Sequence, residues 1–308
     1  MITLNEKRRV YTPKEAIARA KTRPEMLVET LLPAGGVALL AGEPGIGKSF
    51  FALNLAYSVG LKRDFFGLSV NPGEERSNFA YVVGEGLDPL ALRAELIELT
   101  AGTDTADVGK IIDFEGDLLT EPETKDELIE ILDEQNPRFI VFDTFSSLFG
   151  VTSENDNAEV AKTMSFFAFV AKRYDATVLF VHHISKVGKT VRGASAFIGN
   201  VDTVIALRQG LSNPEKENEV RARGVNPKRT FFASTALDHG GKQRGHRECT
   251  HDEFFISPAG LLQNPNLASP SEKAIREKVR EYEKEMREAF IASQVESDKV
   301  DERGEEER

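Results

Sequence analysis

The sequence contains no tryptophan, only one cysteine and no long hydrophobic run. Because Cys249 has no second cysteine to pair with, an internal disulfide framework is excluded and a reducing compartment is favoured. The longest apolar stretches, such as 139–142 and 177–181, fall far short of the roughly 18 to 20 residues of a membrane span. The N-terminal segment has no apolar stretch typical of a signal peptide. We therefore expect a cytoplasmic protein with no membrane contact.

Basic residues are in the minority. Asp and Glu number 50 against 39 Lys and Arg, which gives a net charge of −11 at pH 7. Part of this excess lies from residue 271 onward, where there are 13 acidic and 9 basic residues. Contacts with phosphate depend on local charge, so a chain that is acidic in total can still line one groove with basic groups. The net charge therefore does not exclude a nucleic-acid partner.

Short apolar runs alternate with helical patterns through the first two thirds of the chain. Thr12 and Pro13 have the types expected at the start of a short helix over 13–22. Further on, we expect strands within 33–42 and at 78–84, 138–143 and 176–182, and helices at 48–59, 88–100, 123–135 and 158–174. Near-continuous apolar strands that alternate with helices predict an α/β fold, with a mostly parallel sheet flanked by helices.

The pattern changes after residue 200. Short strands are expected at 202–208, 218–223, 229–234 and 253–257, with no helix between them, as an antiparallel C-terminal extension of the sheet. A charged helix follows, with sparse apolar positions at helical spacing over 271–292. We expect four regions: an N-terminal linker and helix (1–24), the core domain (25–265), the charged C-terminal helix (266–297) and a disordered acidic tail (298–308).

The segment GEPGIGKS fulfils the pattern G-x-x-x-x-G-K-[ST] between a predicted strand and a predicted helix. Glycines there let backbone N–H groups converge on a phosphate, assisted by the helix N-terminus. Lys48 is then expected to reach the β- and γ-phosphates, and the Ser49 hydroxyl to ligate Mg²⁺. The sequence therefore predicts a site for ATP and Mg²⁺ formed by Gly42, Glu43, Pro44, Gly45, Ile46, Gly47, Lys48, Ser49 and Phe50.

Two acidic residues complete this prediction. Asp143 ends an apolar strand, where a carboxylate can hold the magnesium, although it could instead cap the helix that follows. Glu85 lies just past the end of another strand, from where a carboxylate could orient and polarise the attacking water. Asp88 is a competing candidate that fits better as a helix cap, and Glu115 and Asp117 fit better as solvated loop residues.

The order of these motifs resembles the RecA-like P-loop ATPases, and within them the RepA-type hexameric replicative helicases of plasmids and phages. The likeness spans roughly residues 25–235 and is carried by LLPAGGVALLAGEPGIGKSFFALNLA, VVGEG, IVFDTFSSLFG with ENDNAEV, and VHHISK with RGASAFIGNVDTVIAL. It implies a RecA-like core and a homo-oligomeric ring, usually a hexamer, with ATP at subunit interfaces and single-stranded DNA in the channel.

The resemblance also assigns roles to residues. Lys48, Ser49, Glu85 and Asp143 take the family's catalytic positions, and His183, with His182 as second choice, takes that of a γ-phosphate sensor at a strand end. The segment VRARG resembles the strand that supplies an arginine finger in DnaB-type helicases, which nominates Arg221 and Arg223, with Arg208 and Arg229 as alternatives. RepA-type relatives carry an arginine where this chain has Asp202, which is a departure.

Two loops of such a ring would face the channel, at 150–157 and 185–196. The second carries Lys186, Lys189 and Arg192, spaced to follow a phosphate backbone rather than to read bases. We therefore expect an ATP-dependent DNA helicase that works with a primase or a replication initiator. A RecA-like recombinase that forms filaments, and a KaiC-like regulatory ATPase that does not translocate, remain the alternatives.

Overall fold

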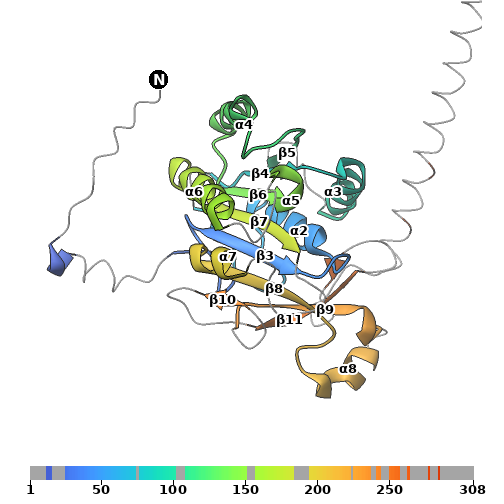
Figure 1. Cartoon of the computed structure of the whole chain (residues 1–308). Helices are drawn as coiled ribbons and strands as arrows, with labels where there is room; N and C mark the ends of the chain where they lie inside the picture. Colours follow the sequence, from blue (N-terminus) through green and yellow to red (C-terminus); the bar gives the residue numbers. More distant parts are fainter. Residues whose placement is uncertain are drawn as a thin grey trace, which may run out of the picture.

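The computed structural model describes residues 12–15, 25–73, 76–101, 108–150, 157–183, 194–222, 225–236, 241–243, 250–256, 262–263, 277 and 284. Among these, a ten-stranded mixed sheet forms the centre of the molecule (Figure 1).

Residues 13–15 are helical, and Thr12 Oγ1 accepts a hydrogen bond from the N–H of Glu15 at 3.3 Å, as expected of a helix cap.

The parallel part of the sheet contains six strands in the order β8-β3-β7-β6-β4-β5. Their bounds are Thr203–Gln209 for β8, Val37–Gly42 for β3, Thr177–His183 for β7, Phe139–Asp143 for β6, Phe79–Val83 for β4 and Gly109–Asp113 for β5. Because these strands are parallel, the loops after β3, β4, β6 and β7 all leave the sheet at the carboxyl ends of the strands. Ligands of open α/β sheets bind at this end of the sheet.

The sheet continues beyond β8 with antiparallel strands, which confirms the predicted extension. They are β9 (Thr230–Ser234), β11 (Thr250–Ile256) and β12 (Leu262–Gln263), while β10 (Lys242–Gln243) also pairs with β8. A separate hairpin is formed by β1 (Met26–Val28) and β2 (Leu32–Pro33).

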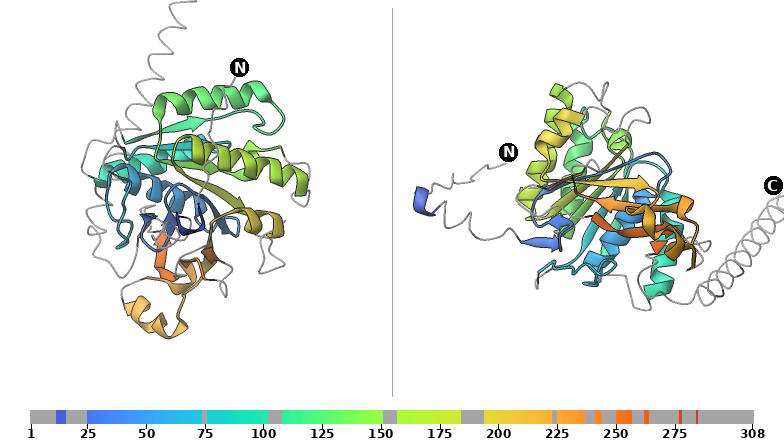
Figure 2. Two further views of the ribbon diagram at one scale, coloured as in Figure 1. Left: turned by 90° about the vertical axis from the view of Figure 1, so that its left-hand side faces the viewer. Right: turned by 90° about the horizontal axis from the view of Figure 1, so that it is seen from below.

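Helices cover both faces of the sheet, as Figures 1 and 2 show. One face packs against α2 (Lys48–Gly60) and α3 (Leu87–Ala101). The other packs against α4 (Pro122–Gln135), α5 (Phe145–Leu148), α6 (Asn157–Arg173) and α7 (Ala194–Asn200). We refer to these as the α2 face and the α6 face.

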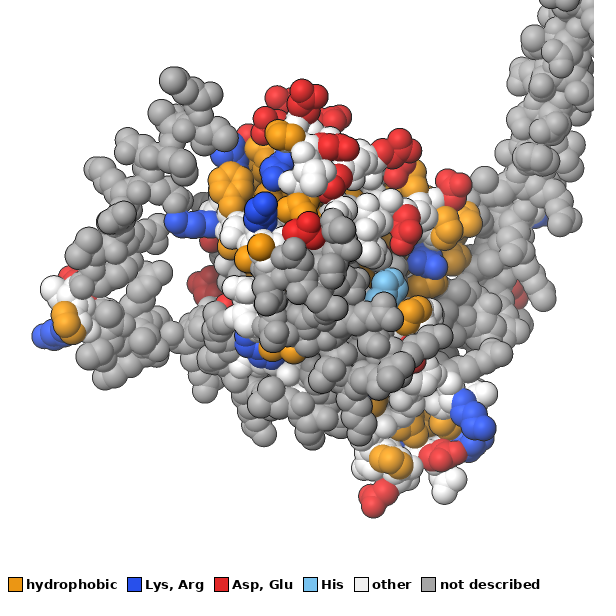
Figure 3. Space-filling view, viewed as in Figure 1, with side chains coloured by type: hydrophobic (Ala, Val, Ile, Leu, Met, Phe, Trp, Pro, Cys, Tyr) orange, Lys and Arg blue, Asp and Glu red, His pale blue; other side chains and the backbone are white. Residues whose placement is uncertain are grey.

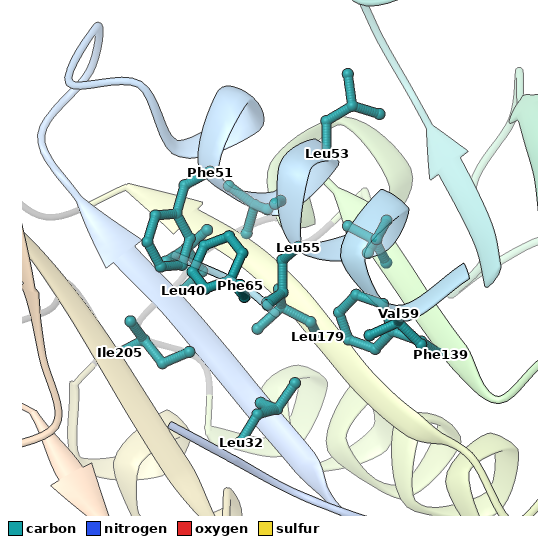
Figure 4. Packing of buried hydrophobic residues seen from close by; sticks show 14 of the residues in the cluster. Leu32, Leu40, Phe51, Leu53, Leu55, Val59, Phe65, Phe139, Leu179 and Ile205 are labelled. Atoms are coloured by element: carbon teal, nitrogen blue, oxygen red, sulfur yellow. The ribbon is translucent and has the colours of Figure 1, made fainter. Parts of the chain in front are cut away.

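Alternation along each strand divides the core between these two faces. On the α2 face, Leu40 of β3 and Leu179 of β7 meet Phe51 and Leu55 of α2, and Figure 4 shows this packing. The next residue of β7, Phe180, instead stacks on Phe167 of α6 with ring centroids 4.9 Å apart. Burying an aliphatic or aromatic side chain of this size stabilises the fold by roughly 1.5 to 3 kcal/mol.

One predicted strand is wrong. Residues 218–223 were expected in a strand, but α8 (Glu217–Ala222) is a helix that follows the short 3₁₀ helix η1 (Pro214–Lys216). The start of η1 is capped by Asn213, whose side chain accepts a hydrogen bond from the N–H of Glu215. Glu217 and Arg221 form an ion pair one helical turn apart. The alternating pattern of this segment is typical of a strand and gave no indication of this helical spacing. The expectation of no helix in this region is wrong for the same reason.

Strand β5, helix α7 and the 3₁₀ helix η2 were also not predicted. Strand β5 is at the edge of the sheet and buries only one of its five residues, so its apolar signal is weak. Helix α7 begins at Ala194, inside the predicted loop 185–196, and a second 3₁₀ helix, η2, spans Pro227–Arg229. The rest of the predicted N-terminal helix and the acidic tail lie outside the described residues. So does the charged C-terminal helix, apart from Glu277 and Lys284, which are both helical.

Figure 3 shows that acidic side chains gather over α4. They include the exposed Glu123, Asp126, Glu127 and Glu130.

Within the described ranges, no helix is long and apolar enough to cross a membrane.

Candidate active site

The loop between β3 and α2 has the backbone conformation that its glycines allow. Gly45 and Gly47 have φ values of 77° and 105°, a region that residues with a Cβ atom rarely adopt. Gly47 also ends the loop as the N-cap of α2, its carbonyl accepting from the N–H of Phe51 at 2.9 Å. The free N–H groups at this helix start can therefore face an anion, as a phosphate-binding loop requires.

A pocket of about 290 Å³ opens at this loop. The strand ends and helices around it contribute Gly45, Gly47, Lys48, Ser49, Phe50, Glu85, Arg93, Asp143, Thr144 and His183. The structure thus brings Lys48, Ser49, Glu85, Asp143 and His183, which were singled out from the sequence, into one cavity. Glu43, Pro44 and Ile46 belong to the same loop but do not line this pocket.

Lys48 is the most buried cation of the pocket, with 5% of its surface exposed. Its ammonium donates to the carbonyl oxygens of Gly42 and Glu43 at 3.1 and 3.0 Å, and Nζ lies 3.0 Å from His183 Nδ1. Burial lowers the pKa of Lys48 to about 8, and the negative charge of Asp143 opposes this shift. These contacts therefore hold the Lys48 side chain against the backbone of the phosphate loop.

Asp143 ends β6 and is 4% exposed. Its Oδ2 accepts a hydrogen bond of 2.6 Å from the Tyr81 hydroxyl, whereas Oδ1 is buried with no hydrogen-bond partner among the described residues. The cap of α5 is instead Thr144, whose Oγ1 accepts from the N–H of Ser147. Asp143 is thus not the helix cap that was its alternative assignment.

The residues of the pocket suit a magnesium ion. Mg²⁺ prefers hard oxygen ligands and uses few carboxylates, and here the unpartnered Asp143 Oδ1 and the Ser49 hydroxyl line the same cavity. Asp143 and Ser49 are therefore the residues that would hold Mg²⁺. The described residues contain no cluster of three or more His, Cys, Asp or Glu side chains that would suit another metal.

Glu85 is exposed at the mouth of the pocket, beyond the end of β4. The preceding residue, Gly84, ties this segment to the Asp143 strand through an N–H···O bond of 2.9 Å to the Asp143 carbonyl. A Cβ atom at position 84 would lie 2.6 Å from Ser147 Oγ and 2.8 Å from Leu148, so only glycine allows this approach. Glu85 is therefore an exposed carboxylate on the lining of the cavity, in the position expected of a group that accepts a proton from water.

The competing acids lie elsewhere. Asp88 is exposed in the first turn of α3 and does not line the pocket. Asp117 is an anchor: its Oδ1 accepts from the N–H groups of Leu119 and Gly150 at 2.8 and 2.9 Å. Glu115 is exposed beyond β5.

The adjacent histidines lie on opposite faces of the sheet, as strand alternation requires. His183 lines the pocket on the α2 face. Burial and the Lys48 ammonium lower its pKa, so the ring is neutral with Nδ1 as the acceptor facing Lys48. His182 is 1% exposed on the α6 face, with its ring 5.3 Å from that of Phe145 and 4.9 Å from that of Phe197.

Arg93 lines the pocket but was not predicted from the sequence. It projects from α3, and its guanidinium lies 4.2 Å from the centre of the Phe50 ring. Burial lowers its pKa, while Tyr81 and Asp143 favour its charge. The signal in the sequence is that Arg93 is the only basic residue of a helix that begins two residues after Glu85.

Of the arginine-finger candidates, the two whose side chains the structure describes, Arg208 and Arg221, do not line the pocket of their own chain. Arg221 lies on α8, rather than on a strand, and pairs with Glu217 at 2.6 Å. Arg208 lies near the end of β8, while Arg223 and the side chain of Arg229 fall outside what the structure describes. Lys186, Lys189 and Arg192 fall outside it as well. Asp202 accepts from the N–H of Val37 at 3.1 Å, at the start of β3 and thus opposite the phosphate loop.

A mostly parallel sheet with a phosphate loop after one strand and an acidic residue ending another defines a P-loop ATPase with a RecA-like core. A family model described as an AAA domain matches residues 6–189, which is more than half of the chain. The chain therefore belongs to this AAA domain family of P-loop ATPases. No curated protein matches it.

Proposed function

We propose that this ATPase is a DNA helicase of the RepA type, which forms a ring, most commonly a hexamer in such proteins, around single-stranded DNA. ATP hydrolysis at the interfaces between subunits would move the ring along the strand during replication of a plasmid, phage or mobile element. A primase or a replication initiator would then be a partner.

The observation that carries this proposal is the place of His183 in the chain. Its Nδ1 lies 3.0 Å from the Nζ of Lys48, in the pocket where the terminal phosphate would bind. The chain continues directly from His183 into the segment that contains Lys186, Lys189 and Arg192. A change at the phosphate that moves His183 would therefore act on a basic segment within a few residues, which suits a motor that tracks a DNA backbone.

The lining of the pocket supports a division of the hydrolysis steps between separate residues. The phosphate loop and Lys48 bind the β- and γ-phosphates, and Asp143 with Ser49 would hold Mg²⁺, which supplies charge neutralisation to the phosphates when bound. Glu85 orients a water molecule for in-line attack and accepts its proton. Arg221 and Arg223 stay the candidates for a finger that acts on the neighbouring subunit.

An unwinding assay on forked DNA with ATP and Mg²⁺ tests this function. Strand separation is expected together with hydrolysis that single-stranded DNA stimulates. Hydrolysis stimulated by DNA without strand separation would count against the helicase, and filaments on DNA seen by electron microscopy would favour a recombinase. A rate of ATP hydrolysis that does not change when DNA is added would favour a regulatory ATPase.

Oligomeric mass gives the second test. We expect a ring-sized species in the presence of ATP and single-stranded DNA, measured by light scattering or native mass spectrometry. The coupling role of His183 predicts that His183→Ala lowers the ratio of hydrolysis rates with and without DNA. An equal ratio in wild type and variant would refute that role.

A further inference from the structure

Tyr81 is a buried polar residue for which the hydrolysis steps above have no role. Strands β4 and β6 are parallel, with Tyr81 opposite Val141 and Val83 opposite Asp143. Alternation places Tyr81 and Asp143 on the α2 face, two positions apart along the strand direction. The long Tyr81 side chain spans this offset, and its hydroxyl lies 2.6 Å from Asp143 Oδ2.

The contact makes the two oxygens of the Asp143 carboxylate unequal. Oδ2 accepts the hydrogen bond from Tyr81, and Oδ1 has no partner among the described residues. Tyr81 is fully buried, so a water molecule cannot readily take the place of its hydroxyl.

Packing alone does not account for this hydroxyl. Phenylalanine would fill the same space between the strand and α2, and burying a hydroxyl costs free energy that a hydrogen bond must offset. The acceptor of this hydrogen bond is the carboxylate of Asp143, and hydrogen bonds to charged groups are short and strong. The hydroxyl therefore acts on the orientation of Asp143.

We propose that Tyr81 is a positioning residue for the metal site: by holding Asp143 Oδ2, it keeps Oδ1 directed at the Mg²⁺ that accompanies ATP. Partners that orient a metal ligand are worth about 10- to 100-fold in metal affinity or activity in other proteins. The inference depends on the ATPase pocket alone and does not depend on the helicase function.

Metal affinity measured without turnover tests the proposal. Mn²⁺, a paramagnetic substitute for Mg²⁺, is titrated into the protein with saturating ADP, and free Mn²⁺ is followed by electron paramagnetic resonance. We expect Tyr81→Phe to weaken Mn²⁺ binding by about tenfold. An unchanged Mn²⁺ affinity would overturn the proposal. The assay contains no DNA, so its outcome is independent of whether the protein unwinds DNA.

Tyr57→Phe is the matched control. The Tyr57 hydroxyl also donates to a carboxylate, Glu98 Oε1, at 2.7 Å, but this pair joins α2 to α3 outside the pocket. Both variants lose one hydrogen bond between a tyrosine and a carboxylate, but only Tyr81→Phe should weaken the affinity for Mn²⁺. If both weaken Mn²⁺ binding equally, the effect is a general loss of stability and the proposal fails.

A double-mutant cycle with Asp143→Asn separates positioning from other effects. If Tyr81 acts through Asp143, the tenfold effect of Tyr81→Phe disappears when position 143 is already Asn. An effect of the same size in both backgrounds would refute action through Asp143. Binding of ADP without metal shows that each variant has a folded pocket. If Tyr81→Phe does not fold, Tyr81→Met, which also lacks the donor, is measured in its place with the same expected loss.

Discussion

The ammonium of Lys48 lies 3.0 Å from Nδ1 of His183, so the phosphate-loop lysine and the strand-end histidine are in direct contact. Two backbone carbonyls, of Gly42 and Glu43, share the same ammonium. A triphosphate in the pocket would compete with all three for Lys48, because an anion attracts the cation more strongly than neutral acceptors do. Nucleotide binding should therefore release His183 from Lys48.

Proton uptake is the first expected consequence. Burial lowers the pKa of Lys48 to about 8 in the free protein, and an adjacent phosphate would raise it again. Near pH 8, binding of a non-hydrolysable ATP analogue without Mg²⁺ should take up roughly half a proton at Lys48. Calorimetry in two buffers with different ionisation enthalpies measures this uptake. Lys48→Arg, which stays charged, should not show it, and equal uptake in both proteins would contradict the assignment.

Removal of the lysine gives a second prediction. Lys48→Ala deletes the buried cation of the pocket, which we expect to bind the β- and γ-phosphates, so hydrolysis should fall to background. Lys125→Ala is the control, because Lys125 lies on α4 with its ammonium over the Phe166 ring, outside the pocket. Steady-state phosphate release measures both. Turnover of Lys48→Ala equal to wild type would refute the phosphate-loop assignment.

His183 should make the stability of the free protein dependent on pH. Burial, then Lys48, lowers its pKa below the ordinary 6.5, while Glu85 and Asp143, which also face it, oppose the shift. The unfolded chain therefore binds this proton at a higher pH than the folded one, so the His183 contribution to stability falls as the pH falls below about 6.5.

His183→Gln removes this titration. Urea unfolding of wild type and variant between about pH 8 and pH 5 should show that the wild type loses more free energy of unfolding on acidification. The difference between the two proteins should be constant above neutral pH, where the imidazole is neutral in both states. Parallel curves down to about pH 5 would show that the pKa of His183 is not lowered.

Much of the fold follows from the sequence because a buried parallel strand needs nearly continuous apolar residues, as in β3, β6 and β7. The carboxyl ends of these strands meet at one edge, which is why the separate segments around Lys48, Asp143 and His183 could be assigned to one pocket. Edge strand β5 was missed because its few apolar residues show no clear period, and helix α8 was taken for a strand because its sequence pattern alternates.

Tyr81 and Arg93 escaped sequence reasoning for a different reason. In the apolar run of β4, Tyr81 has the pattern of an ordinary core residue, and only the register with β6 shows that it reaches Asp143. Arg93 could as well have been a solvated helix residue, because the side of α3 that faces the pocket depends on tertiary packing. Local patterns predict elements, whereas contacts between elements require their relative positions.

Gly84→Ala tests the close approach of the Glu85 segment to α5. The added methyl group would lie 2.6 Å from Ser147 Oγ and 2.8 Å from Leu148, so the segment must shift. We expect a loss of about 1 to 3 kcal/mol in the free energy of unfolding, as for other overpacked sites, and slower hydrolysis because Glu85 moves. Gly199→Ala is the control, because no heavy atom of the described residues, apart from its own stretch of helix, lies within 4 Å of its added Cβ. Unchanged stability and turnover in Gly84→Ala would contradict the tight packing.

Arg93 should contribute to hydrolysis through its charge and its planar shape. It lines the pocket from α3 with its guanidinium 4.2 Å from the Phe50 ring centre, where partial burial strengthens its interaction with phosphate charge. Arg93→Ala should lower kcat by about 100-fold, the effect of losing one preorganised donor, and Arg93→Lys should recover only part of it because lysine lacks the planar guanidinium. Arg173→Ala, which breaks an ion pair with Asp133 outside the pocket, should leave kcat unchanged. If Arg93→Ala hydrolyses ATP as fast as Arg173→Ala, Arg93 stabilises α3 on Phe50 and does not act on the nucleotide.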